Sequence, residues 1–454
     1  MVSTRDSAVA SDPLERDIRR IGTELAAAFP APLRHPVKAL DERAMGYAAE
    51  DRALRAALFR FVDVAPACRS LDELARHLTN LLAEVDEPAP PVAAVLRMGA
   101  HRASRAALGA AAAAGVRHMA HRFIVGESVD AALGVLRDLW QSGVASSIDL
   151  LGEATLTDAE ADAYALRCRV ALDTLSSATG AYPARPVLEA DSLGPLPRGN
   201  LSVKVTALTP LLRPEAPELG ERDAAPRLVA LLGRAADLGV HLHVDMESLD
   251  TREAILEVVL ELLARPELAS GPSAGIVIQA YLRDSPEQLE RVLDWARYSR
   301  RTPPLVVRLV KGAYWDHEIV QARQHGWIPP VFESKAECDR NFEALTRRLL
   351  EARPLVRVAI ASHNLRSLAH AIAYNRLIGG PDRDVELQVL RGLGDDLQHA
   401  LAVHGLRVRA YCPVGDLVSG MAYLIRRLLE NTSNESFLVR GARGESLDVL
   451  LAPP

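Results

Sequence analysis

The chain has 454 residues, of which 49% are hydrophobic and 25% charged, and its formal net charge is −6 at pH 7. This balance is ordinary for a globular protein. It argues against a general nucleic-acid binder, which needs an excess of basic residues. The four cysteines, at positions 68, 168, 338 and 412, are far apart and form no CxxC pair. The sequence therefore predicts neither a disulfide framework nor a zinc ribbon, as is usual in a reducing cytosol.

The start of the chain does not resemble a targeting segment. Residues 1–20 are polar and lack the apolar core of a signal peptide. The sequence also contains no apolar run of about 18 residues, the length that a transmembrane helix needs. We expect a soluble protein located in the cytoplasm.

Residues 1–95 are predicted to form an N-terminal helical arm. Apolar residues recur at three- and four-residue spacing over 58–82, which is the period of an amphipathic helix. Ser70 followed by Glu73 forms a capping box and indicates a helix start. The turn-forming segment EPAPP (87–91) marks the end of the arm's predicted helices. Residues 96–145 are expected to be a helical linker that packs on the next domain.

Eight short apolar runs, most of them rich in β-branched residues, follow in the rest of the chain. They are SIDLLGE (147–153), NLSVKV (200–205), VHLHVDM (240–246), GIVIQAY (275–281), LVVRLVKG (305–312), VRVAIASH (356–363), VELQVLRG (385–392) and RVRAYCPVG (407–415). Helical periodicity separates most of them, as in residues 286–299 and 341–353.

This alternation predicts an α/β fold, namely a (βα)8 TIM-like barrel over residues 146–437. Residues 438–454 are then a C-terminal tail. A doubly wound open sheet is the competing architecture. Such a sheet usually carries a Gly-rich GxGxxG loop, and this sequence contains none.

The stretch RLVKGAYWD (308–316) places two cations at the end of a buried strand. Arg308, Val310 and Gly312 share one strand face, while Leu309 and Lys311 share the other. A buried cation is costly unless it is paired or faces a ligand. The stretch is therefore either a satisfied ion pair near a strand end or one wall of an active site.

Polar side chains also follow the other predicted strands, at the ends where barrel enzymes carry their active sites. They are Glu153, Lys204, Asp245, Glu247, Gln279, Arg308, Lys311, Tyr314, His363, Asn364, Glu386, Gln388 and Tyr411. A structural protein has little reason to gather so many hydrogen-bonding groups at one rim. This ring of residues favours an enzyme.

A helix predicted over residues 420–430 carries a polar stripe. Tyr423, Arg426, Arg427 and Glu430 stand at positions i, i+3, i+4 and i+7 and so share one face. Two adjacent guanidinium groups suit a carboxylate, which they bind in bidentate fashion. A solvated surface face is the other interpretation, and the spacing leaves both open.

Taken together, these motifs resemble a known family. RLVKGAYWD, YCPVG (411–415) and YLIRRLLENTSNESF (423–437) are similar to the proline dehydrogenase domain of the proline utilization A flavoenzymes. The resemblance extends in the family's order to LFRFVDV (58–64), LLGEATLT (150–157), LSVKVTAL (201–208), VDMES (244–248), IQAY (278–281) and ASHN (361–364). It covers residues 45–440 approximately.

The resemblance implies a distorted (βα)8 barrel that binds FAD at its mouth. The implied reaction is the oxidation of L-proline to Δ1-pyrroline-5-carboxylate by hydride transfer to flavin N5, which is the first step of proline catabolism to glutamate. The implied electron acceptor is a membrane quinone, which suggests peripheral contact with the inner membrane face. A separate pyrroline-5-carboxylate dehydrogenase is a candidate partner. No ribbon-helix-helix region is evident, and no aldehyde dehydrogenase half is expected within this chain.

The resemblance also assigns the carboxylate end of the substrate. Arg426 and Arg427 would clamp the proline carboxylate, with Lys204 as a third cation. Glu153 would pair with the clamp and close it over the substrate.

The pyrrolidine ring of the substrate is assigned to two tyrosines. Tyr411 and Tyr423 would pack against this ring. In the family a tyrosine at the position of Tyr411 crowds C4 of proline. The resemblance therefore predicts a strong preference for proline over hydroxyproline.

The remaining implied roles concern catalysis and the cofactor. Asp245, Arg308 and Tyr314 are the expected catalytic residues, with Arg308 near flavin N5, where a cation stabilises added negative charge. The expected cofactor-binding residues are Met246, Gln279, Arg308, Val310, Lys311, Gly312, Trp315, Ser362 and His363.

The residues by themselves allow other functions. His241, His243, Asp245 and Glu247 alternate onto one strand face and, with His363 and Asp416, could form the metal site of an amidohydrolase-like enzyme; we nevertheless expect no metal. Either Lys204 or Lys311 could form a Schiff base in an aldolase-like barrel. A barrel that serves as a regulatory scaffold is a further alternative.

Overall fold

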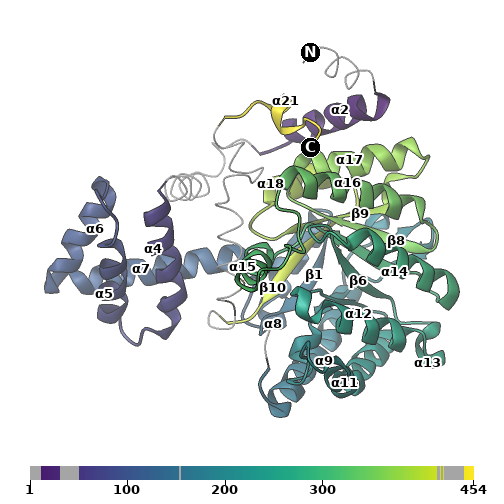
Figure 1. The fold of residues 1–454 in the computed structure, drawn as a ribbon, viewed down its shortest axis with the longest axis horizontal. Helices are drawn as coiled ribbons and strands as arrows, with labels where there is room; N and C mark the ends of the chain where they lie inside the picture. Colours follow the sequence, from purple (N-terminus) through teal and green to yellow (C-terminus); the bar gives the residue numbers. More distant parts are fainter. Residues whose placement is uncertain (1–11, 31–50, 153–154, 417–419, 421–422, 424–443) are drawn as a thin grey trace.

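A closed barrel of eight parallel strands forms the centre of the protein (Figure 1). A computed structural model describes residues 12–30, 51–152, 155–416, 420, 423 and 444–454. The barrel strands are β1 (Val144–Leu150), β4 (Asn200–Val203), β5 (His241–Val244), β6 (Ala274–Gln279), β7 (Leu305–Val310), β8 (Val356–Ala361), β9 (Val385–Leu390) and β10 (Val408–Val414). They close in the order β1-β10-β9-β8-β7-β6-β5-β4. The predicted (βα)8 barrel is confirmed.

Helix α8 precedes the first barrel strand, the other helices follow strands, and together they surround the barrel. They are α8 (Val129–Gln141), α9 (Asp158–Gly180), α11 (Pro217–Leu238), α12 (Leu249–Leu263), α14 (Ser285–Ser299), α15 (Trp315–His325), α16 (Lys335–Glu351), α17 (Leu365–Leu377) and α18 (Asp395–Val403). Local sequence sets their ends: Thr157 and Glu160 form a capping box at the start of α9, and Gly239 ends α11 with φ +64°. Leu, Ile and Val side chains between strands and helices make the main core.

The inner face of the barrel carries buried polar side chains. Glu386 of β9 accepts hydrogen bonds from Arg409 Nε at 2.8 Å and Nη2 at 3.0 Å. His241 and His243 of β5 are joined through Nε2 and Nδ1 at 3.1 Å. We call Glu386, Arg409, His241 and His243 the lower layer, because each stands two or more residues before the cavity-lining residue of its own strand.

A short hairpin contributes to the other end of the barrel. Strands β2 (Ala190–Asp191) and β3 (Gly194–Pro195) pair antiparallel. Buried Asp191 lies 3.2 Å from Arg357 and 3.6 Å from Arg407, both near the N-terminal ends of barrel strands. These ion pairs therefore hold the hairpin at the end opposite to the mouth.

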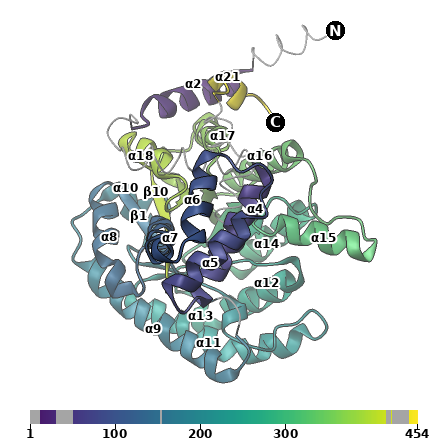
Figure 2. The same cartoon turned by 90° about the vertical axis from the view of Figure 1, so that its left-hand side faces the viewer.

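Four helices form the N-terminal arm, which lies in front of the ring of barrel helices in Figure 2. They are α4 (Arg52–Val64), α5 (Leu71–Leu82), α6 (Pro90–Ala100) and α7 (Arg102–Phe123), and they have a hydrophobic core of their own. Ser70 caps α5 as predicted, accepting a hydrogen bond from Glu73 N at 3.1 Å. The Glu73 carboxylate bonds to Arg69 N rather than to the cap residue, so the capping box is incomplete.

The first described helix belongs to the barrel rather than to the arm. α2 (Pro13–Ala27) packs on α17 (Figures 1 and 2), and Arg366 of α17 binds Glu15 at 2.7 Å and 2.9 Å. The carbonyl of Leu451, beyond α21 (Leu447–Leu450), accepts from the same arginine. Both ends of the described chain thus pack on one side of the barrel.

The expected domain boundaries differ from the elements. Residue 95 lies inside α6, the expected linker 96–145 contains the whole of α7, and β1 begins at Val144. No helix in the described parts of the chain is both long and apolar enough to cross a bilayer.

Candidate active site

A cavity opens at the C-terminal ends of the barrel strands. It contains about 1110 Å³ of empty space, which includes open solvent at the mouth. Most of the predicted site residues line it: Lys204, Asp245, Met246, Gln279, Arg308, Val310, Lys311, Gly312, Tyr314, Ser362, His363, Tyr411 and Tyr423. Barrel geometry thus brings together residues that are more than 200 positions apart in the chain.

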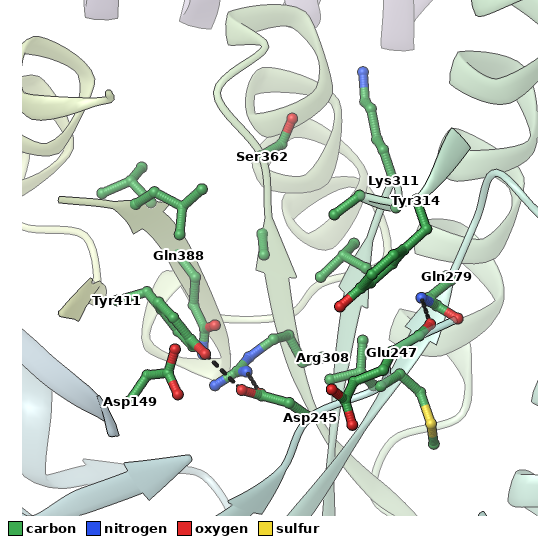
Figure 3. A pocket seen from close by; sticks show the side chains of 18 of the residues that line it. Asp149, Asp245, Glu247, Gln279, Arg308, Lys311, Tyr314, Ser362, Gln388 and Tyr411 are labelled. Atoms are coloured by element: carbon green, nitrogen blue, oxygen red, sulfur yellow. Dashed lines mark hydrogen bonds and ion pairs between the residues drawn. The ribbon is translucent and has the colours of Figure 1, made fainter. Parts of the chain in front are cut away.

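A buried ionic centre forms the floor of this cavity (Figure 3). Arg308 Nη1 donates to Asp245 Oδ1 at 2.7 Å, and the Tyr411 hydroxyl donates to Asp245 Oδ2 at 2.5 Å. The Arg308 guanidinium also lies 5.3 Å from the centre of the Tyr411 ring. Burial, followed by the nearby carboxylates, raises the pKa of Tyr411 well above its usual value. Arg308 is therefore ion-paired with Asp245, and it also lines the cavity.

Lys204 lies between two carboxylates beside this centre. Its ammonium contacts Asp149 and lies 3.8 Å from Asp245. Asp149 of β1 also lines the cavity, and it was not among the predicted site residues. A signal for it existed, because an acid that alternates with Ser147 on a buried strand must face the barrel interior.

Lys311 extends away from the ionic centre, as Figure 3 shows. Its amine contacts Asp339, which also accepts from Lys335 Nζ at 2.6 Å. Burial, followed by the charge of Lys335, lowers the pKa of Lys311. Lys311 and Lys335 lower the pKa of Asp339 in spite of its burial. This trio therefore keeps a positive charge at one side of the mouth.

Gln279 and Gly312 shape the wall between these two charged groups. Gln279 Nε2 donates to the carbonyl of Glu247 at 2.9 Å, but its buried Oε1 has no hydrogen-bond partner among the described residues. Gly312 has φ +135°, and a Cβ there would lie 2.2 Å from the ring of Tyr281. Only glycine fits this backbone position without strain. The wall therefore combines a close backbone approach with an acceptor that is available to a ligand.

The loop after β8 supplies another part of the rim. Leu390 N donates to His363 Nε2 at 2.9 Å, which holds the ring in place beside the end of β9. Ser362 lines the cavity and accepts from Asn364 N at 3.1 Å. Asn364, which we expected in the rim, caps α17 by accepting from Ser367 N. Its role is local and structural.

Several expected residues do not join the cavity. Trp315 is the first residue of α15, is 38% exposed and donates from Nε1 to the carbonyl of Phe332 at 2.9 Å; it is not among the lining residues. Glu386 is bound to Arg409 in the lower layer, whereas Gln388, two residues later, lines the cavity. The residues Glu153, Arg426, Arg427 and Glu430 lie outside the described parts of the chain.

The geometry disfavours the metal and Schiff-base alternatives. Both ring nitrogens of His241 are bonded, Nδ1 to Ser273 and Nε2 to His243. No group of three or more metal-binding side chains occurs within the described residues. Lys311 has the lowered pKa that Schiff-base chemistry uses, but its amine is held by Asp339.

Two family models match the chain. The model for proline dehydrogenase matches residues 132–440, and the model for the proline utilization A N-terminal domain matches residues 15–123. The bifunctional protein PutA of Salmonella typhimurium is 35% identical over 352 residues, which is 75% of this chain and 25% of that protein. Proline dehydrogenase 1 of Bacillus subtilis is 28% identical over 73% of this chain and 93% of its own length.

Solved structures give the same result. The crystal structure of proline utilization A from Bdellovibrio bacteriovorus, inactivated by N-propargylglycine, is 36% identical with a TM-score of 0.87. The match covers 97% of this chain and 44% of that protein. The chain thus spans about a quarter of the length of the Salmonella PutA protein. It spans under half of the chain in the Bdellovibrio structure. From these matches and the barrel, we conclude that the chain belongs to the proline dehydrogenase family.

Proposed function

We propose that the protein is a flavin-dependent proline dehydrogenase that oxidises L-proline to Δ1-pyrroline-5-carboxylate. The observation that carries this proposal is the buried centre of Arg308, Asp245 and Tyr411 at the mouth of a barrel of this family. The centre lies beside a cation, Lys204, and an aromatic residue, Tyr423, in one cavity. Oxidation of a small cyclic amino acid needs these elements: charges for its ends and an apolar wall for its ring.

The charged groups suit the two ends of an amino acid. Lys204 presents a cation for the carboxylate, and the proposed clamp of Arg426 and Arg427 would add two more. Asp149 and Asp245 present carboxylates near a substrate amine. Because its pKa is raised, the Tyr411 hydroxyl stays protonated at neutral pH and keeps its hydrogen bond to Asp245. The floor of the site is therefore held rigidly before substrate binds.

The residues present fit FAD. The buried Oε1 of Gln279 and Nε of Arg308, both without hydrogen-bond partners among the described residues, offer an acceptor and a donor to a planar polar ring. Gly312 allows close backbone approach, and Val310 contributes apolar surface beside it. Lys311, with His363 and Ser362, would hold the polar arm. When bound, FAD supplies the two-electron acceptor that no side chain provides. Arg308 would then stabilise negative charge that develops beside it in a water-poor site.

We extend the proposal to the partners of the reaction. A membrane quinone would take the electrons, at the inner membrane face, from a protein otherwise in the cytoplasm. A pyrroline-5-carboxylate dehydrogenase would take the product. The Salmonella relative is named a bifunctional protein, which supports a second activity, such as this dehydrogenase, linked to proline oxidation.

A visible spectrum of the purified protein tests the proposal. We expect flavin absorption, either as purified or after FAD is added, and bleaching of that absorption when L-proline is added without oxygen. N-propargylglycine, which inactivated the Bdellovibrio protein, should abolish the turnover of proline. A folded, colourless protein that cannot take up FAD, or a flavin that proline does not reduce, would contradict the proposal.

A further inference from the structure

The C-terminal end of helix α7 is fastened to the barrel mouth. Val125 N donates to the carbonyl of Pro413 at 2.9 Å, and Gly415 N donates to the carbonyl of Gly126 at 2.9 Å. The segment after α7 thus pairs with the end of β10, the strand that carries Tyr411. Arg122 Nε also donates to the carbonyl of Gly392 at 3.0 Å, in the loop after β9. Hydrogen bonds therefore join the end of the arm to the rim of the cavity.

Helix α4 of the arm has two apolar faces. Leu54, Ala57 and Phe61 lie in the hydrophobic core of the arm itself. Phe59 and Val62 pack instead against a separate cluster at the barrel mouth. A helix whose second apolar face lies against the catalytic domain contributes to more than its own bundle.

This second cluster contains residues of the substrate pocket. Its buried members are Ala120, Phe123, Ile124, Leu151, Leu393 and Tyr423, and Tyr411 packs against it. Tyr423 is 5% exposed, and both tyrosines line the cavity. Packing is also close at Gly420, where a Cβ would lie 2.6 Å from Ile124 Cδ1. Gly420 and Tyr423 therefore both pack against the end of the arm.

These arm residues lie outside the part of the chain that the proline dehydrogenase model matches, which begins at residue 132. The arm falls instead within the match to the proline utilization A N-terminal domain. A hydrophobic contact between the two parts could stabilise them without any effect on the chemistry. The cluster argues otherwise, because Tyr423 belongs to it and Tyr411 packs against it, and these are two of the three tyrosines that line the cavity.

We propose that Phe59, Val62 and Phe123 are positioning residues for substrate binding, which hold Tyr423 and Tyr411 against the ring of proline. The inference rests on the proposed function and adds the arm to the site that performs it. A side chain in a well-packed cluster is held in one rotamer. When a neighbouring group is removed, the side chain can adopt other rotamers and is held less well in the productive position. A looser Tyr423 would bind the ring of the substrate less well and leave its carboxylate contacts unchanged.

A matched pair of substitutions on α4 tests this proposal in the full-length, FAD-loaded protein. Phe59→Leu alters the face that packs against the cluster of Phe123 and Tyr423, and Phe61→Leu makes the same change in the core of the arm. We expect Phe59→Leu to raise KM for proline by about fivefold with kcat within about twofold, as for the loss of a contact made equally in ground and transition states. We expect Phe61→Leu to lower the melting temperature and leave KM unchanged.

Ligand binding provides a readout that a purely structural role would not change. Tetrahydrofuran-2-carboxylate has the ring and carboxylate of proline without the amine nitrogen, whereas acetate has the carboxylate alone. Phe59→Leu should weaken the binding of tetrahydrofuran-2-carboxylate and leave the binding of acetate unchanged. The shift in flavin absorption measures the binding of each compound. If Phe59→Leu folds poorly, Val62→Ala gives the same test.

The results separate two failures. If proline bleaches the flavin of the parent protein but Phe59→Leu and Val62→Ala leave KM unchanged, the positioning role is wrong and the function stands. Equal changes in KM from the two leucine variants, or equal weakening of both ligands, would also reject it. If proline does not bleach the parent protein, the proposed function itself fails.

Discussion

Two neighbouring layers of the barrel interior contain buried ionic groups and use them differently. In the lower layer, Glu386 and Arg409 bind each other through two hydrogen bonds. Nearer the mouth lies the layer that contains Arg308, Asp245 and Tyr411, which we call the mouth layer. There Arg308 binds Asp245 through one nitrogen, and its Nε has no hydrogen-bond partner among the described residues. A buried pair that satisfies itself specifies structure, whereas one with unused donors beside a cavity is prepared for a ligand. Burial of charge alone does not identify an active site.

The largest expected effect is in the mouth layer. Arg308→Met should lower kcat/KM for proline by roughly 10²–10³-fold, because removal of one preorganised charge-stabilising donor has this cost. Anaerobic flavin reduction measures the loss, and circular dichroism monitors the fold. Arg308→Lys keeps the charge and should recover part of the activity. A folded Arg308→Met protein with full activity would show that the mouth layer, like the lower layer, has no role in catalysis.

The corresponding change in the lower layer should act on stability. Arg409→Met leaves the carboxylate of Glu386 buried with one fewer partner, and breaking such a pair costs roughly 3–5 kcal/mol. In spite of its burial, the arginines nearby lower the pKa of Glu386, so it is ionised at neutral pH. Urea unfolding measures this cost. The folded fraction should keep its KM for proline. A change in KM with unchanged stability would show that the lower layer serves substrate binding rather than structure.

The histidines of the lower layer predict how stability depends on pH. Burial lowers the pKa of His241 from 6.5 to about 3. Below about pH 6.5, His241 therefore binds a proton in the unfolded chain but not in the folded protein. The free energy of unfolding falls as the pH drops below this value. At about 1.4 kcal/mol per pH unit, the loss from His241 reaches on the order of 2 kcal/mol by pH 5. Neither Glu386 nor Asp339, with lowered pKa values, contributes much loss above pH 5.

A substitution separates this histidine from other titrating groups. His241→Gln cannot gain a proton, so its stability should fall less between pH 6.5 and pH 5 than that of the parent protein. Urea unfolding at both pH values measures the difference. Equal slopes in the two proteins would show that His241 is already protonated, or is exposed to water, in the folded state.

The smallest expected effect concerns substrate choice at the mouth layer. Tyr411 is predicted to crowd C4 of proline, so kcat/KM for hydroxyproline should be lower by about tenfold or more, the scale of discrimination by a small group in a pocket. Tyr411→Ser should narrow the difference between the two substrates. Equal kcat/KM values for proline and hydroxyproline in the parent protein would show that Tyr411 does not crowd C4 of the substrate.

Local sequence was enough to determine the architecture and the direction of many side chains. Strand-helix alternation predicted the eight strands of the barrel, and two-residue periodicity predicted that Arg308 and Val310 face the same side. The family motifs predicted most of the residues that line the cavity. These features depend on short-range periods of the backbone, which are visible in any single stretch of chain.

Depth along the barrel and contacts between distant segments were decided by the tertiary structure. A step of two residues keeps a side chain on the inner face but moves it about 6.6 Å along the strand, which separates Glu386 in the lower layer from Gln388 at the cavity. The stagger between strands sets this depth, and it brings Asp149 to Lys204.

The arm shows the same limit over a longer range. The pattern predicted an arm, but not that Phe59 would pack in the same cluster as Tyr423 or that α2 would pack on the barrel. Such contacts join segments hundreds of residues apart. They arise because apolar faces that form locally must then be buried against whatever the closed barrel places beside them.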